Sequence, residues 1–237
     1  MKKEDQITLD HLLIQQGAPL VGSLHVPQLS PTQTIPNIKK CLPINIIDPK
    51  DGLKLWGHCF VKDVHQNKFW NDPLANVAPL QKLEGMISTD YSLYRDYSTN
   101  RQKWNCYRNR IIAYFWQQKG INVIPTASWS TQDSFEWCWE GLPQNSVLAI
   151  TTNGISTDKE GLRHFILGLD EMIQRQNPIA LVVCGHFFPW MEDKYPDIQM
   201  IKIPSYGQLW NEKKKMREQT HYRSTAIVLA KAPRLTR

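Results

Sequence analysis

The amino-acid sequence predicts an α/β fold, with a mostly parallel sheet of repeated βα units that forms an open or incomplete barrel. Short apolar segments that read as strands alternate along the chain with segments whose apolar residues recur at helical spacing. Residues 179–184 are almost entirely apolar, as expected for a strand that is buried on both faces of a parallel sheet. The six or seven strands that we expect are few for a closed eightfold barrel, which favours the open form.

The first fifty residues differ from the rest of the chain. Leu9, Leu12 and Leu13 predict one short amphipathic turn or helix. Six prolines then follow at short intervals from Pro19 to Pro49, and such spacing prevents long helices and central strands. We therefore expect an extended proline-rich arm over residues 1–50 and a single α/β domain over residues 51–237.

The elements after residue 50 are expected from their apolar patterns and their end signals. Asp72-Pro73 predicts a helix start, and Gly85 follows the end of that helix. Asp158 is expected to cap a second helix, which Asn177 closes. Strands are expected at 53–61, 86–89, 121–127, 146–151, 179–184, 198–203 and 225–230, and helices at 71–83, 100–119, 134–142, 158–176 and 211–219.

The longest expected helix, 100–119, carries apolar residues at helical spacing. Trp104, Tyr107 and Ile111 predict the stripe that packs on the sheet. Arg101 and Arg108 lie on another face of the same helix, because they are seven residues apart. The helix therefore presents arginine side chains beside aromatic ones.

Arg108 can be interpreted in two ways. An arginine beside aromatic residues can hold a phosphate or a base through its planar guanidinium. Alternatively it pairs with a carboxylate, because a buried arginine without an anion is costly. We expect the guanidinium to point toward the loop after the second strand of the domain, within reach of Asp90 or Asp96.

The positive charge is concentrated at the C-terminus. Between Asn211 and Arg237 there are eight basic and two acidic residues, and this surplus of six equals the net charge of +6 of the whole chain. A basic patch attracts polyanions such as DNA or RNA. The alternative is a solvated helix face followed by a frayed tail. The candidate nucleic-acid contacts are Lys213, Lys214, Lys215 and Arg217.

The cysteines and the absent motifs narrow the class of protein. Five cysteines without a CxxC pair make a disulfide framework improbable and favour a reducing compartment. The sequence has neither a signal-peptide pattern nor an apolar run of about 18 residues, so we expect a cytoplasmic protein of the host cell without a membrane partner. We find no phosphate-binding glycine loop, dinucleotide fingerprint, GxSxG or HExxH, and we expect no cofactor. His58-Cys59 and Cys184-Gly185-His186 match no zinc spacing, so we expect no metal.

Polar residues follow the expected strands and define a candidate site. Ligands of parallel α/β folds bind beyond the C-terminal ends of the strands. Asp90 and His186 are then the acid–base candidates, one after the second strand and one after the fifth. The alternative is that such side chains only cap helices and turns. The candidate ligand-binding residues are Ser92, Arg108, Ser128, Trp129 and Asn153.

Four ordered segments carry a resemblance to a known family. They are 85–96 (GMISTDYSLYRD), 104–110 (WNCYRNR), 120–129 (GINVIPTASW) and 134–141 (SFEWCWEG). Together they resemble the uncharacterised domain-of-unknown-function family numbered 4417, found largely in phages and mobile elements of bacteria, over about residues 55–190. The resemblance implies a mobile-DNA context and no reaction type. The positions that match its signature are Asp90, Ser92, Tyr94, Asn105, Tyr107, Arg108, Arg110, Trp129 and Asn153.

The chain departs from this family at one point, and three functions stay open. The family pattern often has two acids after the first strand, where this chain has Lys62-Asp63. The first hypothesis is an accessory protein of a phage or mobile element that binds nucleic acid or a nucleotide. The second is an enzyme that acts on a small phosphorylated or sugar-like substrate at the C-terminal rim of the sheet. The third is an interaction protein that blocks a host factor through its proline-rich arm.

Overall fold

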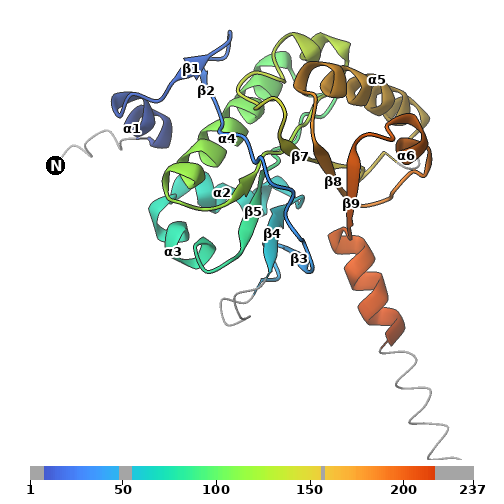
Figure 1. Cartoon of the computed structure of the whole chain (residues 1–237). Helices are drawn as coiled ribbons and strands as arrows, with labels where there is room; N and C mark the ends of the chain where they lie inside the picture. The colour runs from blue at the N-terminus through green and yellow to red at the C-terminus, as the bar shows by residue number, and fades with distance from the viewer. Residues whose placement is uncertain (1–7, 48–54, 156–157, 217–237) are drawn as a thin grey trace, which may run out of the picture.

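Parallel strands follow one another in sequence order around the molecule (Figure 1). The computed structural model describes residues 8–47, 55–155 and 158–216. Every pairing among the seven strands from β3 to β9 is parallel. A single bridge between Thr126 and Ala149 joins the four-stranded part to the three-stranded part. The strands are β3 (Cys41–Pro43), β4 (Trp56–Cys59), β5 (Gly85–Thr89), β6 (Val123–Ile124), β7 (Val147–Thr151), β8 (Ala180–Cys184) and β9 (Gln199–Ile203).

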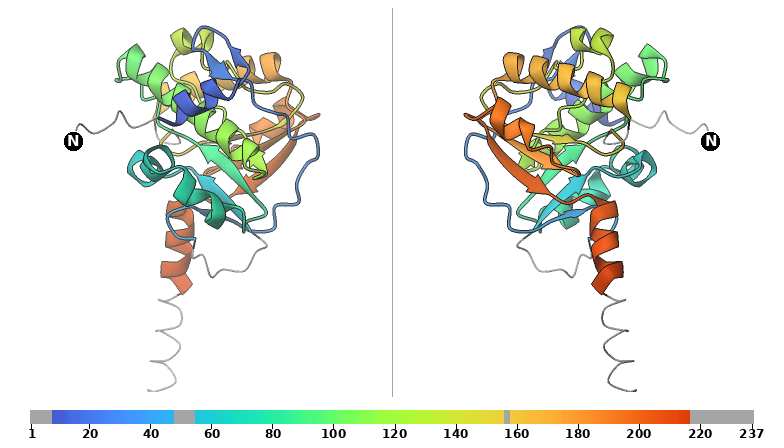
Figure 2. Two further views of the ribbon diagram at one scale, coloured as in Figure 1. Left: turned by 90° about the vertical axis from the view of Figure 1, so that its left-hand side faces the viewer. Right: turned by 90° about the vertical axis from the view of Figure 1, so that its right-hand side faces the viewer.

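Helices connect consecutive strands and lie outside the curled sheet (Figure 2). The connection between β5 and β6 contains α4 (Thr99–Gln118), and the connection between β7 and β8 contains α5 (Lys159–Gln176). A further helix at 206–216 follows β9 and projects from the body of the molecule. The shorter helices are α1 (Leu9–Gln15), α2 (Asp63–Asn71), η1 (Leu74–Asn76), α3 (Val77–Leu80), η2 (Gln132–Glu136) and α6 (Trp190–Lys194).

Strands β4 to β8 are buried on both faces, whereas β9 is partly exposed. Alternate side chains of the buried strands enter different cores. In β8, Ala180 and Val182 belong to an inner core that also contains residues from β3 to β7. Leu181 and Val183 point the other way and pack in the core beneath α5. This alternation follows from the period of two in a β-strand. Each valine or leucine side chain of β8 contributes roughly 1.5–3 kcal/mol when it is fully buried.

The N-terminal segment contacts the body of the molecule through backbone and side chains. β1 (Leu20–Val21) and β2 (Val26–Pro27) form a two-residue antiparallel pair. The Glu140 carboxylate accepts hydrogen bonds from the N–H groups of Ser23 and Leu24, each at 2.8 Å. Gly22 has a φ of +71°, and a Cβ there would lie 2.2 Å from the Glu140 side chain, so only glycine fits. The expected arm over residues 1–50 and the domain boundary after it stay predictions.

Most expected elements are present, and the four central strands run in the same direction as predicted. The expected helices at 100–119 and 158–176 correspond to α4 and α5. Asp158 caps α5 by accepting from the Glu160 N–H, and Asn177 ends it in the left-handed region. Leu9 and Leu13 are the buried residues of α1, as the amphipathic pattern predicted.

Two expectations about local structure are wrong, and a third is met over a shorter range. The helix expected at 71–83 begins after Pro73, where the Asp72 carboxylate accepts from the Ala75 N–H at 3.4 Å, but it consists of η1 followed directly by α3 and ends at Leu80. Asp72 adopts an extended φ of −142°, which is the conformation that a following proline favours. The strand expected at 121–127 is limited to β6, since Pro125 has no N–H to donate. Instead of a helix at 134–142, the chain forms η2, which ends at Glu136.

The buried face of α4 also differs from the prediction. Trp104 is 44% exposed, whereas Arg110 is 1% exposed. Polar side chains are buried here because they bond to backbone groups of neighbouring loops: Asn109 Oδ1 accepts from the Tyr91 N–H at 2.8 Å. The strand expected at 225–230 lies outside the described residues. Within the described ranges, none of the helices is long and apolar enough to cross a membrane.

Candidate ligand pocket

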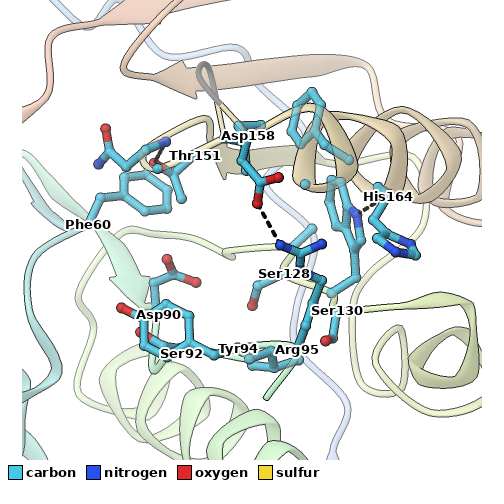
Figure 3. A pocket seen from close by; sticks show the side chains of 18 of the residues that line it. Phe60, Asp90, Ser92, Tyr94, Arg95, Ser128, Ser130, Thr151, Asp158 and His164 are labelled. Atoms are coloured by element: carbon cyan, nitrogen blue, oxygen red, sulfur yellow. Dashed lines mark hydrogen bonds and ion pairs between the residues drawn. The ribbon is translucent and has the colours of Figure 1, made fainter. Parts of the chain in front are cut away.

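A pocket of about 500 Å³ opens at the C-terminal ends of β4, β5, β6 and β7 (Figure 3). We call it the rim pocket. Loops after each of these strands contribute to its wall, together with the first turns of α5 and the start of the helix at 206–216. Its polar lining residues are Lys62, Asp90, Ser92, Tyr94, Arg95, Ser128, Ser130, Thr151, Asn153, Asp158, His164 and Tyr206. Its aromatic apolar lining residues are Phe60, Trp129 and Phe165.

Asp90 follows β5 directly and is held by its backbone. Its N–H donates to Gln66 Oε1 at 2.7 Å, and its carbonyl accepts from Gln66 Nε2 at 3.1 Å. Gln66 is fully buried in α2, so this pair of bonds fixes the strand end against that helix. The carboxyl group is left to face the rim pocket, beside Ser128 (Figure 3).

The surroundings of Asp90 favour its protonated form. Burial raises the pKa of the carboxyl to about 7, and the neighbouring Asp63 carboxylate acts in the same direction. A hydrogen bond from Ser128 and the charge of Arg110 lower the pKa but do not cancel the effect of burial. A carboxyl group of this kind can give or take a proton near neutral pH. We expected this acid–base chemistry for Asp90 from its position after a strand in the sequence.

Ser92 is engaged in holding the pocket wall. Its hydroxyl donates to Asp63 Oδ1 at 2.9 Å, and its carbonyl accepts from Asn105 Nδ2 at 2.6 Å. The bond to Asp63 ties the loop after β5 to the first turn of α2. The single acid of Lys62-Asp63 therefore serves as a partner of Ser92, which lines the pocket.

Trp129 lines the rim pocket but is packed on α5. Its indole N–H donates to the His164 carbonyl at 3.1 Å, and its ring stacks on Phe165 with centroids 5.5 Å apart. A Cβ on Gly168 would lie 2.0 Å from Trp129 Nε1, so glycine allows the indole to lie against the helix. The ring edge is left to contact a ligand.

An ion-pair cluster closes the opposite side of the pocket (Figure 3). Arg95 contacts Asp158 Oδ2 at 2.5 Å and Glu160 Oε2 at 2.9 Å. The backbone hydrogen bond from Gly161 and the charge of Arg95 hold the pKa of Asp158 below its ordinary value. Asn153 lines the same pocket from the loop after β7.

His186 lies after β8 but does not line the rim pocket. Its exposed ring packs edge-on against Phe188, with centroids 4.7 Å apart. The reason lies in the preceding turn: Gly185 has a φ of +106°, and the His186 carbonyl accepts from Thr152 Oγ1 at 2.8 Å. His186 is thus separated from Asp90, its expected acid–base partner.

Arg108 also lies outside the pocket lining, and the prediction that a carboxylate is its partner is wrong. Its guanidinium stacks over the Tyr91 ring at 3.6 Å and donates to Asn105 Oδ1 at 2.6 Å. Among the described residues it forms no ion pair with Asp90 or Asp96. The ring of Tyr91 and the amide of Asn105 occupy the positions where we expected a carboxylate.

The C-terminal candidates are only partly described. Lys213, Lys214 and Lys215 have exposed side chains on the helix at 206–216. Arg217 lies outside the described residues. Within the part of the chain that the structure describes, no group of three or more His, Cys, Asp or Glu side chains is placed to hold a metal ion. All five cysteines are buried and free.

Several lining residues were missed by sequence reasoning. Arg95 stands in a segment that the resemblance singled out, yet its position gave no sign that it would pair with acids 63 residues away. Asp158 was expected only as a helix cap. Tyr206 lies far from the other lining residues in sequence, and the spatial order of β4 to β9 brings it to the same rim. His164 follows Gly161 on α5 and was not singled out by any sequence signal.

Comparisons with known proteins agree with the resemblance seen in the sequence. The model of a family described as a domain of unknown function, DUF4417, matches residues 18–204. The chain is 28% identical to the Gene 1 protein of Mycobacterium phage D29 over 210 residues, which are 87% of this chain and 75% of the relative. It is 30% identical to the Gene 1 protein of Mycobacterium phage L5 over 197 residues, 82% of this chain and 83% of the relative. No solved structure matches.

Proposed function

We propose, from the premise that this chain belongs to the DUF4417 family and is homologous to mycobacteriophage Gene 1 proteins, that its rim pocket binds a small sugar- or nucleoside-like molecule. Asp90 exchanges a proton with that ligand. The observation that carries the proposal is the position of Asp90 in the pocket wall, with its pKa raised to about 7.

The lining of the pocket supports a ligand with hydroxyl groups and a flat ring. The hydroxyl of Ser128 and the amide of Asn153 can donate and accept hydrogen bonds. The hydroxyls of Ser92 and Thr151 already donate within the protein and can accept hydrogen bonds from a ligand. Phe60 contributes an apolar ring to the same wall. A volume of about 500 Å³ is within the range of pockets for small organic molecules.

The charges of the pocket argue against a phosphorylated ligand. Arg95 is neutralised by Asp158 and Glu160, which leaves it little attraction for another anion. Lys62 is the other lining lysine or arginine, and one lysine is a small attraction for a phosphate group in a pocket that also contains the acidic side chains of Asp90 and Asp158. We therefore favour a neutral ligand over the phosphorylated one that the sequence also allowed. Blocking of a host factor, and DNA or RNA binding by the C-terminal lysines, stay predictions.

Thermal unfolding with a panel of small molecules tests the proposal. Ribonucleosides, deoxyribonucleosides and monosaccharides are added to the whole chain at pH 6 and pH 8, each beside its phosphate ester. We expect at least one neutral compound to raise the Tm, because a ligand that binds only the folded state stabilises it. The size of the increase should differ between the two pH values.

The matched variants are Asp90→Asn and Asp197→Asn. Asp197 is exposed and lies outside the pocket lining, so its variant should keep the full response. Asp90→Asn should lose the pH dependence of the response, since an amide does not titrate. Stronger stabilisation by the phosphate esters, or no response to any compound, would contradict the proposal.

A further inference from the structure

A surface of arginine and aromatic side chains extends from the mouth of the rim pocket along α4. It consists of Tyr94, Tyr97, Arg101, Trp104 and Arg108, and we call it the α4 surface. Tyr94 lines the pocket and is 58% exposed, and Trp104 is 44% exposed. Tyr94, Arg101 and Trp104 are exposed, whereas Tyr97 and Arg108 are half-buried. None of the five belongs to a core cluster, so the exposed side chains call for another explanation.

The members of the α4 surface are in contact with one another. Tyr94 packs edge-on against Tyr97, with ring centroids 5.1 Å apart, and the Arg101 guanidinium lies 3.7 Å from the centroid of Tyr97. Arg108 lies 5.6 Å from the ring centroid of Trp104. Arg101 is also close enough to Arg108 for its charge to lower the pKa of the Arg108 guanidinium, after the larger effect of burial. Arg101 and Trp104 are three residues apart on α4 and are therefore neighbours on its surface, which places the two groups of side chains next to each other.

The positive charges of this surface are not neutralised by direct ion pairs. Arg101 and Arg108 form no ion pair within 4.0 Å among the described residues. The Nε atom of Arg108 is buried without a hydrogen-bond partner. Asp63, whose charge acts on Arg108, accepts hydrogen bonds from Ser92 instead. Two neighbouring guanidinium groups without bound carboxylates complement an anionic partner.

The aromatic rings decide which anionic partner fits. Trp104 stacks on Tyr107 with an interplanar angle of 16°, and Trp70 meets its ring edge-on at 5.1 Å. These neighbours fix the orientation of the exposed indole. Fixed exposed rings beside arginines are the combination that binds single strands, where bases stack on rings and phosphates meet guanidinium groups. A duplex keeps its bases inside and cannot use the rings.

We propose that the α4 surface binds single-stranded nucleic acid. Bases stack on Trp104 and Tyr94, and Arg101 contacts the backbone phosphates. This site is separate from the C-terminal lysines, and it does not depend on the function proposed for the rim pocket. Because Tyr94 belongs to both, a strand held on the α4 surface passes the mouth of that pocket.

Fluorescence anisotropy tests the proposal. The labelled probes are an oligo-dT of twelve nucleotides, an oligo-rU of the same length and a matched duplex. The whole chain is titrated at 50 and 200 mM salt. We expect both single strands to bind more tightly than the duplex, and binding to weaken as salt rises. Arg101→Ala should reduce the salt dependence by about 0.7 in the slope of log K against log salt, the value for one phosphate contact on a single strand.

Trp104→Ala should weaken single-strand binding by about fivefold or more, the effect of losing one base stack. Trp104→Phe keeps a ring and should recover part of the affinity, which separates stacking from damage to the fold. Arg163→Ala, an exposed arginine on α5, is the matched control and should bind like the unchanged chain. Trp210 is exposed on the helix at 206–216, which carries the C-terminal lysines. The variant Trp210→Ala therefore tests whether this helix binds the nucleic acid.

Three results would overturn the proposal. The first is an absence of binding at 50 mM salt. The second is equal affinity for the duplex and the single strands. The third is a loss of binding in Trp210→Ala with full binding in Trp104→Ala, which would move the nucleic-acid site to the C-terminal helix.

Discussion

Ser128, which follows β6, lies beside the carboxyl group of Asp90, which follows β5, and lowers the pKa of that carboxyl. The two residues come from different βα units and meet at the rim pocket. Ser128 favours the charged carboxylate, whereas burial favours the protonated one, and burial has the larger effect. Asp90 therefore titrates close to neutral pH in the folded protein.

The first prediction follows from this titration. The folded-state pKa of Asp90 is about 7, and its ordinary value is 3.8. A raised pKa contributes stability that is fully present below about pH 4 and is lost as the pH rises through 7. We therefore expect Asp90→Asn to stabilise the protein at pH 8 relative to the unchanged chain, by on the order of 2 kcal/mol, and to have a smaller effect at pH 5.

Thermal melting at both pH values measures this difference. Comparing variant and unchanged chain at each pH removes the contribution of other titrating groups. One of these is His58, whose pKa is lowered to about 4 by burial. Asp197→Asn should give the same small change at pH 5 and pH 8. If Asp90→Asn behaved like Asp197→Asn, Asp90 would not be the neutral-pH group of the pocket.

The second prediction concerns Arg110, which is buried and bonds only to backbone carbonyls among the contacts described. Its guanidinium donates to the carbonyls of Glu140, Thr126 and Cys138, at 2.9, 3.2 and 2.8 Å. Arg110→Met fills a similar space but removes the guanidinium donors from all three carbonyls, of which that of Cys138 keeps only a weak contact from the Cys106 thiol at 3.8 Å. We expect a loss of on the order of 3 kcal/mol in the free energy of unfolding, measured in urea.

The control for Arg110 is Arg163→Met, because Arg163 is exposed on α5. That variant should change the free energy of unfolding by less than about 0.5 kcal/mol. A loss of similar size in both variants would mean that the carbonyl bonds of Arg110 do not stabilise the fold.

The architecture could be predicted because its signals are local. The alternation of apolar strands and amphipathic helices gives α4, α5, β7 and β8 with bounds close to those expected. The helix start at Asp72-Pro73 was also local and could be predicted, whereas the length of that helix could not, since η1 and α3 together end at Leu80. The buried Arg110 could not be predicted from periodicity, because its partners are loop carbonyls from distant segments.

Part of the candidate site could also be predicted from the sequence, for a similar reason. Asp90, Ser128, Trp129 and Asn153 follow strands whose parallel order was predicted, and all of them line the rim pocket. Whether they bind a ligand stays a prediction. His186 follows a strand as well, but the direction of its side chain depends on the turn at Gly185, which the strand-end rule does not describe.

The third prediction concerns the contact of Gly168 with Trp129. A Cβ at position 168 would lie 2.0 Å from the indole nitrogen, so Gly168→Ala must displace the ring. Alanine favours a helix by about 1 kcal/mol over glycine, yet we expect the clash to exceed this gain and to lower the Tm. Gly207→Ala is the matched control, because its Cβ would meet nothing closer than 3.9 Å. An equal or higher Tm in Gly168→Ala would show that Trp129 is not fixed on α5.

The last prediction replaces the expectation of a buried ion pair at Arg108. The guanidinium stacks on Tyr91 at 3.6 Å and bonds to Asn105, without a carboxylate in contact among the described residues. Removal of one partner of a buried ion pair costs about 3–5 kcal/mol, whereas a partly exposed cation–π contact contributes roughly 0.5–2 kcal/mol. Because Arg108→Ala leaves no unpaired acid behind, we expect a loss near 1 kcal/mol in the free energy of unfolding in urea, in keeping with that range. Arg108→Lys keeps the charge but not the planar stack, so it should recover only part of this loss. A loss above about 3 kcal/mol in Arg108→Ala that is fully restored in Arg108→Lys would indicate that Arg108 forms a buried ion pair.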